Sequence, residues 1–260
     1  MSVRAGRPAI STRARVSVDR ARVALGDRRA AVNVVWLLAL CPGSEPRISG
    51  VLEELEELIP LGVEIRRRQR EAGRRSFAQF RAPFELYTLV RLLEPEHILE
   101  TGVSSGVSSA YFLAGLRRNG HGTLHSADLP TPQRSARFGR ADSPVALPPG
   151  RATGWAVPDG LRAGWDLRLG PSRKVLPQIV RGIDALGIFL HDSEHTPSHL
   201  AFELVTVRPR LADGAVVLAD NTIWTGRAFP RFASALGSRV TRRGRSDLAG
   251  LRVPGPGASG

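Results

Sequence analysis

Cysteine, lysine and long apolar runs are scarce in this sequence. Cys41 is the only cysteine, which excludes a disulfide framework and a zinc site built from cysteines and fits a reducing, cytoplasmic compartment. No run approaches the roughly 20 apolar residues that a membrane helix needs. The longest candidate, residues 30–41, contains Asn33 and follows a long basic stretch, so we expect a short buried helix rather than a membrane span or a signal peptide.

Arginine supplies nearly all of the positive charge. The chain has 37 basic and 24 acidic residues and a formal net charge of +13, yet Lys174 is its only lysine. A basic chain can bind nucleic acid, and the basic run at residues 66–75 is either an RNA or anion contact or a solvated helix face. Because the charge is spread along the chain and the arginine preference looks like coding bias, we favour a small-molecule substrate over nucleic acid.

Residues 1–80 show little regular pattern. Residues 1–29 are rich in arginine, alanine and valine without a clear period, so we expect a disordered arm or a misassigned start. Residues 51–58 read Val-Leu-Glu-Glu-Leu-Glu-Glu-Leu, the pattern of an amphipathic helix with an acidic face. We therefore divide the chain into a basic N-terminal arm with short helices, residues 1–80, and a second domain, residues 81–260.

Helical and extended patterns alternate through residues 81–260. A helix is expected at residues 83–93, with Pro83 in its first turn and Pro95 just past its end. Strands are then expected at 97–101, 122–127, 166–169, 186–191, 214–219, 238–242 and 248–253, and helices at 105–118, 172–182, 197–210 and 227–236. This alternation predicts an α/β fold, with a doubly wound, mostly parallel seven-stranded sheet and helices on both faces.

One long insertion interrupts the alternation. Residues 129–164 are rich in proline, glycine and arginine and contain Trp155. A loop of this length inside a compact domain is usually functional or disordered. It follows the carboxyl end of the second strand, on the rim where open α/β sheets bind ligands, so we interpret it as a substrate lid.

A glycine turn after the first strand constrains the function most. Residues 98–106 read Ile-Leu-Glu-Thr-Gly-Val-Ser-Ser-Gly, and Gly102 and Gly106 allow a sharp turn and a close approach of a ligand to the main chain. The spacing is neither the GxGxxG of dinucleotide sites nor the GxxxxGK[ST] of phosphate loops. Because Glu100 would repel a pyrophosphate, a cationic or zwitterionic ligand fits better. The alternative is a tight turn whose glycines serve packing alone.

Three further strands also end in polar residues on this rim. Asp128 follows the second strand and could accept both hydroxyls of a ribose, or simply form a cap or turn. Asp192 follows the fourth strand, and Asp220 and Asn221 follow the fifth. Two carboxylates and an amide oxygen suit a hard cation such as Mg²⁺, although an Asp-Asn pair after a strand can also be turn chemistry.

Together these motifs resemble the class I S-adenosylmethionine-dependent methyltransferases. The resemblance rests on Glu-x-Gly-x-x-x-Gly after strand one, an acidic end to strand two and Asp-Asn-x-x-Trp after strand five. It is greatest to the metal-dependent O-methyltransferases of the catechol and caffeoyl-CoA type, and Asp192-Ser-Glu-His195 is similar to the Asp-x-x-His of macrolide-sugar O-methyltransferases. It covers about residues 83–255 and implies a Rossmann-like fold with S-adenosyl-L-methionine as the cofactor.

The resemblance also implies roles for individual residues. Those expected at the cofactor are Glu100, Gly102, Ser104, Gly106, Asp128 and Asp192, and those expected at a metal, most simply Mg²⁺, are Asp192, Asp220 and Asn221. The two glycines would cradle the methionine part, Glu100 would face its ammonium through water, and Asp128 would hold the ribose. His195 would take the position of the general base.

Elementary chemistry agrees with the role of His195. A cation lowers the pKa of a bound hydroxyl, and a nearby neutral histidine, with an ordinary pKa of about 6.5, can remove the proton. The sulfonium methyl then transfers in line, helped mostly by positioning. Two other interpretations of His195 stay open: it stands at a helix start and could cap or pack there, and its spacing from His199 resembles a zinc pair without cysteine partners.

Two departures from the family pattern affect the site. Pro171 stands where the family often has a residue that contacts the adenine ring, and Glu194 competes with Asp192 as the residue facing the metal.

Three functions are compared: an O-methyltransferase of small hydroxylated molecules, which we favour, an RNA 2′-O-methyltransferase using the basic arm, and a non-catalytic binding or scaffold protein. No Asn/Asp-Pro-Pro-Tyr motif for adenine methylation is present. We expect no membrane contact, and the resemblance is compatible with a homodimer.

Overall fold

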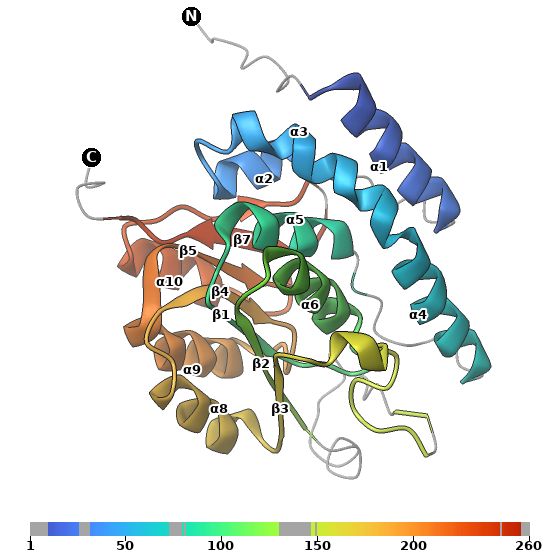
Figure 1. Ribbon diagram of the computed structural model, residues 1–260. Coiled ribbons are helices and arrows are strands. Elements are labelled where there is room, and N and C mark those ends of the chain that lie inside the picture. Colours follow the sequence, from blue (N-terminus) through green and yellow to red (C-terminus); the bar gives the residue numbers. More distant parts are fainter. Residues whose placement is uncertain are drawn as a thin grey trace, which may run out of the picture.

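The structure is a computed structural model that describes residues 10–25, 32–72, 80, 82–129, 147–148, 150–244 and 246–255 (Figure 1). Most of the predicted lid, residues 130–146, and the first part of the predicted arm, residues 1–9, lie outside the described residues. The described chain forms one sheet between two layers of helices, and N-terminal helices lie outside one of these layers.

The sheet has seven strands in the order β3-β2-β1-β4-β5-β7-β6. The strands are β1 His97–Thr101, β2 Thr123–Asp128, β3 Trp165–Leu169, β4 Leu186–His191, β5 Leu211–Ala219, β6 Thr241–Arg242 and β7 Ala249–Arg252. Strands β1 to β5 pair in parallel, whereas β7 is antiparallel to both β5 and β6. The predicted fold class is therefore confirmed, although β6 is shorter than expected and β5 begins earlier.

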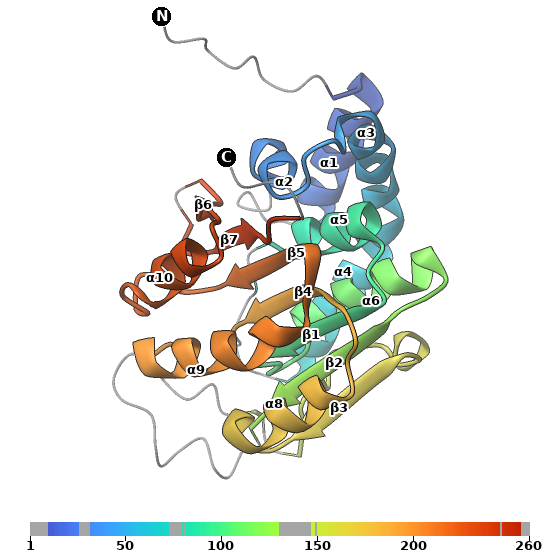
Figure 2. The same cartoon turned by 90° about the vertical axis from the view of Figure 1, so that its left-hand side faces the viewer.

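Two helix layers cover the sheet because the central strands are apolar on both faces. Phe189 packs in the core beneath α8 Ser172–Arg181, α9 Pro197–Val207 and α10 Ala228–Ala235. Its neighbour Leu190 packs in the core beneath α5 Pro83–Leu93 and α6 Val107–Asn119. Both side chains are fully buried, and such strands read as continuous apolar runs in the sequence. Figure 2 shows the sheet between these layers.

The first N-terminal helix was not expected. Helix α1 covers Thr12–Ala24, so the expectation of a disordered arm is wrong for these residues. Its buried face consists of Ala14, Ser17 and Ala21, small side chains at helical spacing that leave no strong apolar period in the sequence. Ser11 caps the helix, because its hydroxyl accepts the Ala14 N–H at 3.0 Å.

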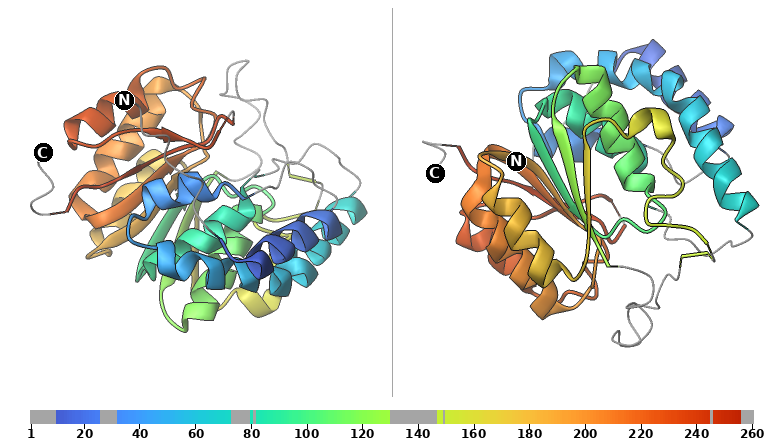
Figure 3. Two further views of the ribbon diagram at one scale, coloured as in Figure 1. Left: turned by 90° about the horizontal axis from the view of Figure 1, so that it is seen from above. Right: turned by 60° about the horizontal axis from the view of Figure 1, so that its bottom comes forward.

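The remaining N-terminal segments continue the helical extension alongside α5 and α6 (Figure 3). They are α2 Val34–Leu40, α3 Glu45–Glu53, the 3₁₀ helix η1 Glu54–Leu58 and α4 Ile59–Glu71. Two further 3₁₀ turns, η2 Asp159–Leu161 and η3 Arg208–Arg210, lie later in the chain. The helix expected at 30–41 corresponds to α2. The helix expected at 51–58 is divided between the end of α3 and η1. The 3₁₀ part, η1, buries Leu55 and Leu58.

Candidate functional site

The polar strand ends predicted to form the site meet at one edge of the sheet. Main-chain hydrogen bonds continue the parallel pairing beyond the strands there. The Asp192 N–H donates to the Thr101 carbonyl at 2.9 Å, and the Asp220 N–H donates to the His191 carbonyl at 3.0 Å. The loops after β1, β4 and β5 are therefore held side by side, as expected for the carboxyl edge of an open α/β sheet.

The glycine turn is packed against protein on both sides. Gly102 has φ +85° and Gly106 has φ +91°, a region that favours glycine. A Cβ on Gly102 would lie 1.9 Å from the main-chain oxygen of Asp192, and one on Gly106 would lie 2.5 Å from Val157 Cγ2. Chain packing therefore requires both glycines, which was one of the two interpretations that the sequence left open. This holds whether or not the turn also contacts a ligand. Ser104, between them, is buried and has φ +52°.

Glu100 lies beneath the glycine turn and is fully buried. Its carboxylate accepts hydrogen bonds from the hydroxyls of Ser108 at 2.8 Å, Ser126 at 2.7 Å and Ser109. Burial raises the pKa of Glu100 to about 7 despite these hydrogen bonds. The carboxylate thus joins β1, β2 and the start of α6 beneath the turn through these hydrogen bonds. The serines were not identified from the sequence, although the Ser-Ser pair two residues after Gly106 was visible there.

Asp128 lies at the end of β2 and is almost completely buried. One carboxylate oxygen accepts the Val103 N–H at 3.3 Å, and the other accepts the Thr153 hydroxyl at 2.8 Å. The cap-or-turn alternative is therefore partly correct, because Asp128 does hold the glycine turn. Thr153 belongs to the insertion and had no signal in the sequence, since nothing there indicates that residues 153 and 128 meet.

The end of the insertion lies along the glycine turn. The Gly154 N–H donates to the Ser104 carbonyl at 2.8 Å, and the Ala156 N–H donates to the Ser105 carbonyl at 3.0 Å. Helix α4 reaches the same place, where the Gln69 amide donates to the Ser105 hydroxyl at 3.3 Å. The N-terminal extension and the described part of the predicted lid therefore both border the site.

His195 brings the remaining predicted residues together. Its Nε2 lies 3.4 Å from Asp192 Oδ1 and 3.4 Å from Asn221 Nδ2. Asn221 has φ +50°, a left-handed conformation that asparagine tolerates better than most residues. The cap of α9 is Thr196, whose hydroxyl oxygen accepts the His199 N–H at 3.2 Å. His195 is therefore not the capping residue and faces the ends of β4 and β5.

The structure brings the predicted metal ligands near one another, and the metal itself stays a prediction. Asp192 and Asn221 approach one imidazole nitrogen, and Asp220 immediately precedes Asn221. Within the described residues, no three histidine, cysteine, aspartate or glutamate side chains gather as a metal site would require. A cation here would therefore depend on the Asn221 amide oxygen in addition to carboxylates, a set compatible with Mg²⁺. The zinc alternative for His195 and His199 has no third ligand of these types among the same residues.

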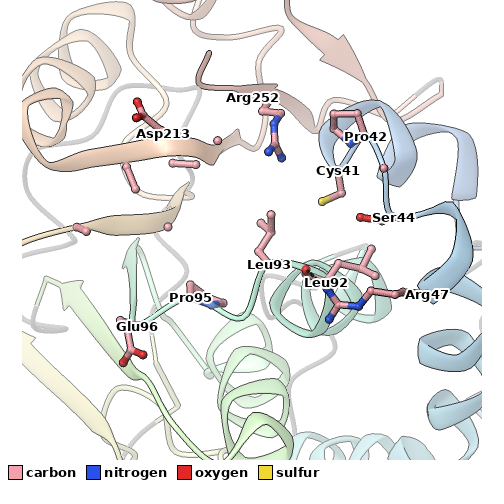
Figure 4. Close-up of a pocket in the computed structure, with 16 residues that line it drawn as sticks. Cys41, Pro42, Ser44, Arg47, Leu92, Leu93, Pro95, Glu96, Asp213 and Arg252 are labelled. Carbon is pink, nitrogen blue, oxygen red and sulfur yellow. Dashed lines mark hydrogen bonds between the residues drawn. The ribbon is translucent and has the colours of Figure 1, made fainter. Parts of the chain in front are cut away.

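A separate cavity of about 460 Å³ lies at the opposite edge of the sheet (Figure 4). The Cys41 thiol, Arg47 and Arg252 border it together with the residues just before β4 and the beginning of β5. Burial raises the pKa of the Cys41 thiol to about 12, so it is an unreactive packing group. None of the predicted site residues lines this cavity.

Residues 99–222 match a family described as "Methyltransferase domain" (Methyltransf_24). The matched stretch begins within β1, just before the glycine turn, and ends just after Asn221, so it contains nearly all of the edge described above. The resemblance to methyltransferases seen in the sequence is thereby confirmed. No curated protein is significantly similar to the chain in sequence.

Several solved structures share the fold. The O-methyltransferase TomG from Streptomyces achromogenes, in complex with S-adenosylmethionine, is 19% identical with a TM-score of 0.52, and the similarity covers 75% of this chain and 89% of that one. A putative O-methyltransferase from Klebsiella pneumoniae is 18% identical with a TM-score of 0.52, covering 75% and 90%. The calicheamicin methyltransferase CalS11 is 18% identical with a TM-score of 0.50, covering 97% and 96%.

These comparisons agree with the architecture. Residues 99–222 are similar to a methyltransferase domain, the chain shares the fold of the solved methyltransferases, and the likeness to CalS11 extends over the N-terminal helices. Among the described helices, none is long and apolar enough to cross a membrane.

Proposed function

We propose that this protein is an S-adenosylmethionine-dependent O-methyltransferase that acts on a small hydroxylated molecule with the help of a divalent cation such as Mg²⁺. The contact between Gly102 and the main chain of Asp192 carries the proposal. It joins the glycine turn, where the cofactor would bind, to the loop that carries Asp192 and His195. A methyl donor on the turn would therefore lie next to a potential base.

The cofactor roles follow from the order of the strand ends. Gly102, Ser104 and Gly106 would border the methionine part, with Glu100 supporting the turn from beneath. Asp128 would hold the ribose hydroxyls, which requires the Thr153 hydroxyl to leave one of its oxygens. TomG, which has the same fold and is described in complex with S-adenosylmethionine, supports this choice of cofactor.

The methyl transfer needs one base and one electrophile. The acceptor oxygen attacks the methyl carbon, the carbon–sulfur bond breaks, and S-adenosylhomocysteine leaves. His195 Nε2 takes the hydroxyl proton, while Asp192 next to it stabilises the resulting imidazolium. Asp192, Asp220 and Asn221 would hold the cation, which when bound lowers the pKa of the hydroxyl.

Asp220→Ala tests the proposal. Methyl transfer to a panel of aromatic diols and hydroxylated sugars should fall by roughly two orders of magnitude, because the cation loses a ligand. The affinity for S-adenosylhomocysteine, measured by calorimetry, should stay nearly unchanged. The matched control is Asp213→Ala, an exposed carboxylate at the opposite edge, which should change neither quantity.

Two results would contradict parts of the proposal. Parallel loss of transfer and of S-adenosylhomocysteine binding in Asp220→Ala would show that Asp220 is structural. Undiminished transfer by the natural protein in EDTA would remove the cation from the mechanism while leaving the methyltransferase itself intact.

A further inference from the structure

Glu203 is a buried carboxylate that no part of the proposed reaction uses. It lies on α9, is fully buried, and accepts four hydrogen bonds. The donors are Thr101 at 2.6 Å, His191 at 2.7 Å, Ser193 at 2.9 Å and His199 at 2.9 Å. These donors come from three separate segments, the ends of β1 and β4 with the loop that follows, and α9 itself.

A buried charged carboxylate destabilises the fold unless hydrogen bonds and opposite charges compensate for its lost hydration. Burial alone would raise the pKa of Glu203, but His191 and His199 hold it well below its usual range. The carboxylate is therefore charged, and each of its oxygens has two donors. Charge-assisted hydrogen bonds of this kind are short and fix geometry more strongly than neutral ones.

The partners of Glu203 flank the two loops of the proposed site. Thr101 directly precedes Gly102, and His191 and Ser193 stand on either side of Asp192. The ring of His191 also packs edge-on against that of His195, with centroids 5.6 Å apart and an angle of 87°. A movement of the glycine turn can therefore reach the His195 loop through a single side chain.

We propose that Glu203 is a positioning residue that couples the glycine turn to the loop of Asp192 and His195, so that cofactor binding at the turn sets the position of the base. This inference rests on the proposed function. It goes beyond it by assigning a coupling role to a residue that contacts neither cofactor nor acceptor. If Glu203 holds the unliganded turn in its binding conformation, a change at Glu203 also lowers cofactor affinity.

A purely structural role is the competing explanation. In that case Glu203 stabilises the fold, but its surroundings do not respond to a ligand on the turn. The two explanations differ at His199, which bonds Glu203 and lies on α9 rather than on either loop. Coupling requires His199 to respond when the turn is occupied, and the response must pass through Glu203.

The imidazole ¹⁵N–¹H NMR spectrum measures this response. The chain has six histidines, of which His191, His195 and His199 belong to the cluster and His97, His121 and His125 lie elsewhere as internal references. Titration with S-adenosylhomocysteine should shift the His199 signals in the natural protein. It should leave the reference signals nearly unchanged.

Thr101→Val cuts one hydrogen bond to Glu203 while keeping the side-chain shape. We expect the His199 shift to shrink and S-adenosylhomocysteine affinity to fall roughly three- to tenfold. Glu203→Gln should remove the His199 shift. If Glu203→Gln does not fold, Thr101→Val still tests the coupling. Glu96→Gln is the matched control, because it removes an exposed carboxylate that pairs with His121, far from Glu203. Its His199 shift, referenced to His97 and His125, should equal that of the natural protein.

Four outcomes are informative. A His199 shift that shrinks in Thr101→Val supports the coupling. A His199 signal that does not change in saturating S-adenosylhomocysteine overturns the coupling and leaves Glu203 structural. A His199 shift that is the same in Thr101→Val also overturns it, and would indicate a path through Ser172, which also bonds His199. Failure of the natural protein to bind S-adenosylhomocysteine would instead refute the proposed function, on which this inference depends.

Discussion

Removing the hydroxyl of Thr153 tests how Asp128 would bind the cofactor. The hydroxyl donates to Asp128 at 2.8 Å, and both side chains are buried. If Asp128 holds the ribose, the ribose hydroxyls must replace this hydrogen bond. Thr153→Val keeps the side-chain shape and removes this one donor, so a ribose hydroxyl can take its place without competition.

The magnitude follows from the charge on Asp128. A hydrogen bond to a charged group contributes about 1.5–3 kcal/mol. The free energy of unfolding of the unliganded Thr153→Val protein should therefore fall by about that amount, which lowers the melting temperature by about 5 °C for a chain of this size. Because the ribose supplies the missing donors, S-adenosylhomocysteine should bind roughly tenfold more tightly or better.

Calorimetric titration and thermal unfolding with and without S-adenosylhomocysteine measure both effects. Thr206→Val is the matched control, because its hydroxyl donates to the main-chain oxygen of Phe202 within α9. It should leave affinity unchanged. Weaker S-adenosylhomocysteine binding in Thr153→Val would refute the reasoning, since it would mean that Thr153 supports the ribose site or contacts the cofactor itself.

Two further predictions concern the glycine turn. Gly102→Ala should unfold the site or abolish S-adenosylhomocysteine binding, because its Cβ would lie 1.9 Å from the Asp192 oxygen, and a folded variant with normal affinity would contradict this contact. Glu100 has a pKa raised from 4.5 to about 7, so the folded state binds its proton more tightly than the unfolded state. The stabilisation from Glu100 is thus present below pH 4.5 and is lost as the pH rises through 7. The free energy of unfolding, measured with urea, should fall by about 3 kcal/mol over this range, and Glu100→Gln should make it depend less on pH.

The sheet could be predicted because its signal is local. Strands buried on both faces appear as apolar runs such as Ile188–Leu190, and their polar ends mark the carboxyl edge. Parallel order then brings Asp192 and Asn221 together without knowledge of any side-chain contact. These steps depend only on spacing along the chain and on the pairing rules of α/β sheets.

The missed features depend on distant neighbours. Helix α1 buries small residues such as Ala14 and Ala21, so its period is weak although its packing is close. Thr153 meets Asp128 only because the insertion folds back along the glycine turn. Glu203 looks like an ordinary helix carboxylate until β1, β4 and α9 meet around it. In each case the role of the residue depends on a partner that is distant in the sequence.

Calorimetric titration of the natural protein with S-adenosylhomocysteine, in Mg²⁺ and in EDTA, tests the central claim most directly. Our account predicts binding in the micromolar range in both conditions, because the cofactor would contact the glycine turn and Asp128 rather than the cation. The absence of binding in both conditions would contradict it and make the glycine turn a packing feature of a non-catalytic protein.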